Sequence, residues 1–103
     1  MGLLFSSPRL SAWKKGVMKA IDKMAHTAPF FDHDVYITTH ELTNSITIHG
    51  NVYYHKTGYS VRYTQEWAEQ YFLDQVQDWV RVYCGDLGDP PAIRGSFRVV
   101  GRR

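Results

Sequence analysis

Apolar and polar residues alternate along most of residues 34–65, a stretch dense in valine, isoleucine, threonine and tyrosine. A period of two in such residues is typical of β-strands that bury one face. The pattern predicts strands at 34–41, 45–55 and 59–64, with turns at 42–44 and 56–58. The buried face is expected to hold Val35, Ile37, Ile46, Ile48, Val52, Tyr54, Val61 and Tyr63. The exposed face is expected to hold Tyr36, Thr38, His40, Thr47, His49, Asn51, Tyr53, His55, Ser60, Arg62 and Thr64.

The strand at 45–55 has an alternative interpretation, because Gly50-Asn51 has the composition of a two-residue hairpin loop. A loop there would divide the segment into two strands of only about four or five residues each. We therefore favour one long strand that bends at Gly50.

Two segments repeat their apolar residues at helical spacing. The first runs from Pro8 to about 24–26, with Ser6 or Ser7 as its cap, and its buried stripe is Leu10, Trp13, Val17, Ala20, Ile21 and Met24. Gly16 weakens this helix and indicates close approach to another element. The second begins after Thr64, its expected cap, and ends before Gly85, with the stripe Trp67, Ala68, Tyr71, Phe72, Val76, Trp79, Val80 and Tyr83. Between the first helix and the first strand, Phe30 and Phe31 are expected to pack beneath the sheet, and residues 92–100 read as a last strand.

The order of elements is therefore α-β-β-β-α-β, which predicts an α+β fold of two layers. Both helices are expected on one face of an antiparallel sheet, with Trp13, Ile37, Ile46, Ile48, Phe72, Val76 and Trp79 in one core. Residues 1–7 are predicted to be a flexible segment, 8–100 a single domain and 101–103 a basic tail. The order α-β-β-β-α resembles that of double-stranded-RNA-binding domains. That family carries lysines at the start of its second helix, where this chain has Gln65-Glu66 and Glu69.

Charge is segregated along the chain, although the net charge is only +2. The first helix carries five basic residues against Asp22 alone, the second is acidic, and the last ten residues carry four arginines and no acid. This distribution indicates an anionic partner. A single cysteine, Cys84, excludes an intramolecular disulfide and favours a reducing compartment, so we expect a cytoplasmic protein.

The opening Met1-Gly2-Leu3-Leu4-Phe5-Ser6 fits the N-myristoylation pattern, in which Gly2 is the acyl acceptor. One acyl chain binds a membrane weakly, so stable attachment needs a second signal. The basic residues expected to contact an anionic leaflet are Arg9, Lys14, Lys15, Lys19 and Lys23. The alternative is a chance match to a short pattern.

The exposed sheet face is the second candidate site. Its rings and cations are suited to stacking and hydrogen bonding with single-stranded RNA, or to anchoring a protein partner. The residues proposed for this face, together with the last strand, are Tyr36, His40, His49, Tyr53, His55, Arg62, Arg94 and Arg98. Arg94 and Arg98 are expected to share a face, and the alternative for all of these is an ordinary solvated surface.

No enzyme signature is present, and we expect no catalytic residue, metal, cofactor or small-molecule substrate. His49 and His55 are six residues apart, a spacing that does not bring two ligands together on one strand. Cys84 at the end of an apolar stripe is typical of a small buried side chain, and His33 between two aspartates is typical of a solvated linker.

The leading hypothesis from the sequence is a non-enzymatic adaptor, similar in kind to a viral matrix protein, at the cytoplasmic face of a membrane. Its acylated N-terminus and basic helix would hold the membrane, and its sheet face would bind a protein, with self-association among the interactions expected. The first alternative is a small RNA-binding domain that uses the sheet face and the C-terminal arginines. The second is an inhibitor or assembly protein that acts only through protein contacts.

Overall fold

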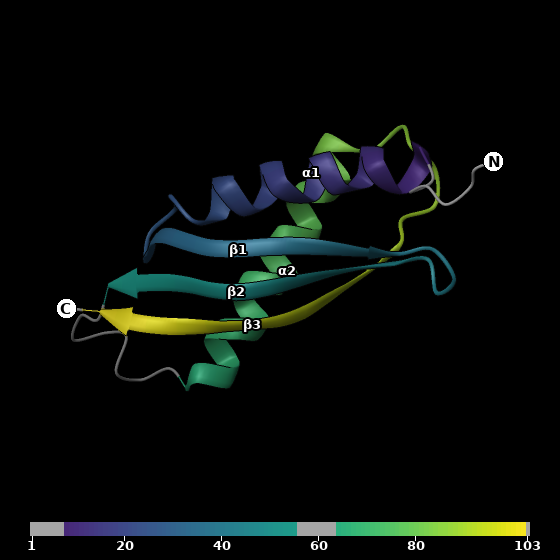
Figure 1. The fold of residues 1–103 in the computed structure, drawn as a ribbon. Coiled ribbons are helices and arrows are strands. Elements are labelled where there is room, and N and C mark those ends of the chain that lie inside the picture. The colour runs from purple at the N-terminus through teal and green to yellow at the C-terminus, as the bar shows by residue number, and fades with distance from the viewer. Residues whose placement is uncertain (1–7, 56–63, 103) are drawn as a thin grey trace.

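The chain folds into an α+β structure, which confirms the class predicted from the sequence. The computed structural model describes residues 8–55 and 64–102. Its elements are α1 (Pro8–Met24), β1 (Phe30–His40), β2 (Ser45–His55), α2 (Gln65–Tyr83) and β3 (Ala92–Arg102) (Figure 1). The strand predicted at 59–64 lies almost wholly outside the described residues.

The sheet is mixed, so the prediction of a wholly antiparallel sheet is wrong. The strand order is β1-β2-β3; β1 and β2 pair antiparallel, whereas β2 and β3 pair parallel. A parallel pair needs a long crossover connection, and α2 lies within the connection between β2 and β3. The alternation of residues places side chains on faces but carries no information on strand direction.

The β1-β2 hairpin is longer than predicted. β1 begins at Phe30 and so includes residues expected to form a link, because a bulge between Phe30 and Asp32 keeps the early part of the strand paired with β2. β2 has the predicted bounds and is one continuous strand, so Gly50-Asn51 is not a hairpin loop.

Gly50 is required by the pairing of β1 with β2. Its φ is 108°, a conformation that residues with a side chain rarely adopt, and a Cβ there would lie 2.1 Å from the backbone oxygen of Asp34. The two strands therefore approach closely at the middle of the hairpin.

Both helices and one face of the sheet supply a single core. Figure 1 shows α2 crossing behind the three strands and α1 running alongside β1. The buried members are Leu10, Trp13, Val17, Ala20, Ile21 and Met24 of α1, Ala68, Phe72, Val76 and Val80 of α2, and Phe30, Ile37, Ile46, Ile48, Val52, Phe97 and Val99 of the strands. Trp79 packs against this core but is only partly buried.

The start of α2 has the capping hydrogen bond expected from the sequence. The Thr64 hydroxyl accepts a hydrogen bond from the backbone N–H of Trp67 at 3.0 Å, which confirms the predicted cap of α2.

A Cβ at Gly16 would lie 2.1 Å from the Cys84 sulfur, so the close approach expected at this glycine is between α1 and the end of α2. Within the described residues, no helix is long and apolar enough to cross a membrane.

The other face of the sheet, called here the open face, carries the side chains that alternate with the core. Strand register and the ring contacts described below assign it Phe31, Asp32, Asp34, Tyr36, Thr38 and His40 of β1, Thr47, His49, Asn51, Tyr53 and His55 of β2, and Arg94, Ser96, Arg98, Val100 and Arg102 of β3. Most of these residues are half-buried or exposed, and Tyr36 is 62% exposed.

Candidate nucleic-acid interface

The open face brings together seven of the residues proposed from the sequence. These are Tyr36 and His40 on β1, His49, Tyr53 and His55 on β2, and Arg94 and Arg98 on β3. Two proposed residues, Gly2 and Arg62, lie outside the described part of the chain.

Three arginines form a row along β3. Arg94, Arg98 and Arg102 are four residues apart, so they point to one face of the strand, and each is exposed. The spacing between neighbours in the row is about 13 Å at the rise of a β-strand. Arg94 and Arg98 share a face as predicted; the third position extends the row to the end of the strand.

The aromatic and histidine rings of β1 and β2 are stacked beside this row. Tyr36 and His49 are direct neighbours in the register, with ring centroids 4.7 Å apart and planes 9° from parallel. The Thr38 hydroxyl contacts His49 Nε2 at 2.8 Å and His40 Nε2 at 3.1 Å. These contacts hold the rings in one orientation at the centre of the face.

A second group of rings lies near the carboxyl ends of β2 and β3. Phe31 stacks on His55 at 4.3 Å, and the Arg102 guanidinium lies 4.5 Å from the centroid of the Tyr53 ring. The prediction that Phe31 packs beneath the sheet is wrong: Phe30 is buried in the core, whereas the bulge turns Phe31 to the open face. Sequence reasoning counted Arg102 among the C-terminal arginines but did not find its contact with Tyr53, and it did not place Phe31 on this face, because these contacts depend on the bulge and on the direction of β3.

Charge on the open face changes from one edge to the other. Asp32 and Asp34 are exposed on β1, whereas the arginine row is on β3, two strand spacings or about 10 Å away. An anionic ligand is therefore favoured over β2 and β3 and repelled at β1.

Three of the basic residues of α1 contact neighbouring elements. The Arg9 guanidinium donates hydrogen bonds to the Asn44 side-chain oxygen and the Asp89 backbone oxygen. Lys19 Nζ lies 5.0 Å from the Tyr83 ring and Lys23 Nζ lies 5.0 Å from the Trp79 ring.

Lys14 and Lys15 are exposed and border a hollow along α1 that extends to Thr39 of β1. The hollow has a volume of about 520 Å³ and is lined by Ser11, Lys14, Lys15, Met18, Lys19, Asp22 and Thr39. Three lysines and one aspartate give this surface a modest positive charge.

The candidate catalytic groups are in structural contacts. Cys84 is buried at the end of α2; burial raises the pKa of its thiol, the charge of Asp86 raises it further and Lys19 opposes the change. His33 lies within β1 and not in a solvated linker, with Nε2 2.9 Å from an Asp22 carboxylate oxygen. Among the residues that the structure describes, no group of three or more histidine, cysteine or acidic side chains is arranged to hold a metal ion.

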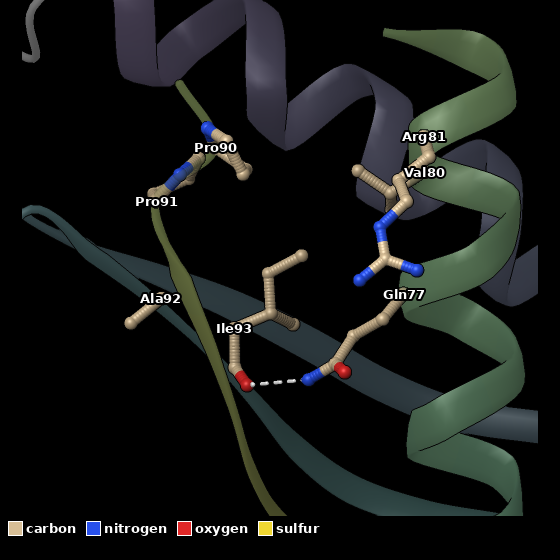
Figure 2. A pocket seen from close by; sticks show the side chains of 7 residues that line it. All are labelled: Gln77, Val80, Arg81, Pro90, Pro91, Ala92 and Ile93. Carbon is tan, nitrogen blue, oxygen red and sulfur yellow. Dashed lines mark hydrogen bonds between the residues drawn. The ribbon is translucent and has the colours of Figure 1, made fainter. Parts of the chain in front are cut away.

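A small pocket of about 210 Å³ lies between α2 and the start of β3 (Figure 2). The Gln77 amide donates a hydrogen bond of 3.2 Å to the Ile93 backbone oxygen, and Pro90 and Pro91 form the opposite wall. Arg81 borders the pocket and pairs with Asp78 at 3.0 Å. These contacts fix where β3 begins relative to α2, and thereby the position of the arginine row.

Comparison of the chain with protein-family models, with curated proteins and with solved structures finds no significant match.

Proposed function

We propose that the protein binds single-stranded nucleic acid, of which RNA is the test case, on the open face, with its backbone along the arginine row of β3 and its bases directed across β2 towards Tyr36. In this proposal the domain has two layers: both helices lie on one side of the sheet, and the open face is the other side. The observation that carries it is the arginine row of β3 beside the stacked rings of β1 and β2.

The chemistry of the open face supports this ligand. Single-stranded nucleic acid is bound by cations that follow its backbone and by aromatic side chains on which bases stack. The row of Arg94, Arg98 and Arg102 supplies the cations, and Tyr36 supplies a ring that is 62% exposed. An oligonucleotide that follows the row for its full length would occupy a site within the range of about 4–16 nucleotides seen for other single-strand-binding domains.

Duplex RNA is a poorer fit. Recognition of a duplex depends on contacts to phosphates and 2′-hydroxyl groups across a rigid surface, without stacking on splayed bases. The start of α2, which is the basic element in the double-stranded-RNA-binding fold resembled by the predicted order, carries Gln65, Glu66 and Glu69 here. We therefore expect single strands to compete successfully against duplexes.

The test is fluorescence anisotropy of a labelled oligouridine of about twelve nucleotides, with and without an unlabelled RNA duplex. Arg94→Ala with Arg98→Ala should weaken binding by roughly tenfold or more and reduce its dependence on salt. Tyr36→Ala should weaken it by about 5- to 100-fold, the effect of losing one stacked base. The matched control is Lys14→Ala with Lys15→Ala, which removes the same charge from α1 and should change binding little. Equal losses of affinity in the two double variants would show that binding depends only on net charge and would refute the proposal.

An acylated, membrane-bound adaptor is the second candidate, and the observation in its favour is the exposure of Lys14 and Lys15. It ranks below nucleic-acid binding because Arg9, Lys19 and Lys23 already contact neighbouring elements. Flotation with anionic vesicles tests it: Gly2→Ala should prevent acylation, Lys14→Glu with Lys15→Glu should remove the attraction to anionic lipid, and each change should release the protein from the vesicles. Flotation that is the same for wild type and both variants would exclude the membrane function.

A further inference from the structure

The open face is complementary in charge to a copy of itself. Its two aspartates are on β1 and its three arginines are on β3, at opposite edges of the sheet. Among residues 8–55 and 64–102, no ion pair joins the two groups, because β2 separates them by about 10 Å.

The strand register makes this complementarity specific. Asp34 pairs with Asn51 and Asn51 pairs with Arg98, so these three residues form one row across the sheet. A two-fold axis parallel to β2 places β1 of one copy over β3 of the other and keeps each residue at its own height along the strands. Asp34 of each copy then faces Arg98 of the other, which gives two equivalent ion pairs.

We propose that the open face is the interface of a homodimer, in which two sheets pack face to face about this axis. Sheets stack with their strands within about 30° of each other, which keeps β1 of one copy above β3 of the second. Tyr36, which is 62% exposed, lies next to the row of Asp34 and is covered in this arrangement. Asn51 and the stacked His49 lie close to the axis and face the same strand of the second copy.

The area of the face predicts a weak dimer. Each strand has 11 residues. At the usual rise and strand spacing the face covers about 500 Å², so two copies bury roughly 1,000 Å² in total. This is the lower limit for a specific interface, and we expect reversible association in the micromolar range.

Dimer formation goes beyond the proposed function and does not depend on it. It covers the arginine row, so a second copy and a single-stranded nucleic acid compete for the same surface. The two interactions differ in what they require of Asp34, which is attractive for a second copy and repulsive for phosphate.

The experiment is sedimentation equilibrium from about 1 to 500 µM, which spans the expected micromolar range. It compares wild type, Asp34→Arg, Arg98→Asp and the double exchange. Either single change opposes like charges at both contacts and should weaken association by roughly tenfold or more. The double exchange restores opposite charges in each pair and should recover most of the association. Asp74→Arg, a change of equal charge on the exposed side of α2, is the control and should leave it unchanged.

Three results would overturn the dimer: a wild type that stays monomeric at the highest concentration, an Asp34→Arg protein that associates like wild type, or a double exchange no better than the single changes. Circular dichroism melts of each variant ensure that only folded proteins are compared. Anisotropy with oligouridine separates the two proposals. Asp34→Arg should bind the oligonucleotide at least as well as wild type while losing association, and the double exchange should recover association without improving nucleic-acid binding.

Discussion

The contact between Gly16 of α1 and Cys84 at the end of α2 gives a sharp test of how the two helices pack. A Cβ added at Gly16 would lie 2.1 Å from the Cys84 sulfur but 3.7 Å from its Cβ. The first distance is far inside van der Waals contact, whereas the second is an ordinary contact. Gly16→Ala should therefore gain about 1 kcal/mol of helix propensity and lose about 1–3 kcal/mol to overpacking. The expected net change is a loss of up to about 2 kcal/mol.

A double-mutant cycle isolates the clash. Cys84→Ala alone removes the sulfur from a buried site and should cost about 1 kcal/mol. In the double variant the new methyl group at position 16 occupies part of the vacated space, so the helix propensity is gained without the clash. The two changes should then couple favourably by about 1–3 kcal/mol in urea unfolding followed by tryptophan fluorescence. Additivity within about 0.5 kcal/mol would refute the close approach of α1 and α2 at this position.

Three further predictions test the core, the hairpin and the thiol. Phe72→Ala should cost about 3–5 kcal/mol in the same assay, whereas Trp79→Ala should cost only about 2 kcal/mol because that ring is partly exposed; equal losses would contradict this packing. Gly50→Ala should cost more than about 2 kcal/mol, from the strained φ and the contact with a backbone oxygen, and a neutral effect would contradict the hairpin register. The raised pKa of Cys84 favours the neutral thiol in the folded state, so its contribution to stability is complete below the pKa of an unfolded thiol and is lost as pH rises through the folded pKa. The stability of wild type should therefore fall faster than that of Cys84→Ala above about pH 8.5, and parallel pH curves would show that the thiol is not desolvated.

Periodicity in the sequence predicted the elements better than it predicted their assembly. β2, α1 and the Thr64 cap of α2 have the predicted positions, because each depends on a local pattern of apolar residues or on one capping side chain. The predicted start of β1 was wrong because a bulge allows the residues after Phe30 to remain paired with β2. No local sequence pattern marks a bulge. The predicted direction of β3 was wrong because the alternation of apolar and polar residues is the same whichever way a strand runs.

For the candidate site, too, the sequence predicted which residues share a face but not which of them are in contact. Alternation was enough to place Tyr36 and His49 on one face, since it depends only on the period of a strand. It could not show that their rings stack, because that contact depends on which residues of β1 and β2 are opposite each other. The contact of Arg102 with Tyr53 required both the length and the direction of β3.

The direction of β3 also determines which interactions the open face can make. With β3 parallel to β2, Arg98 lies in the same row as Asn51 and Asp34. If β3 ran antiparallel over the same span, its arginines would still face the same way, because reversal about the centre of an 11-residue strand preserves the face. Arg98 would then pair with His49, and Ser96 would take the row of Asp34. A single-stranded nucleic acid needs only a row of cations beside exposed rings and would tolerate either direction. The two-fold contact between Asp34 and Arg98 exists only in the parallel arrangement, because in the antiparallel one Asp34 would face Ser96 and Arg94 would instead take the row of Asp32. The charge-exchange experiment between positions 34 and 98 is therefore also a test of the parallel pairing, whereas nucleic-acid binding alone is not.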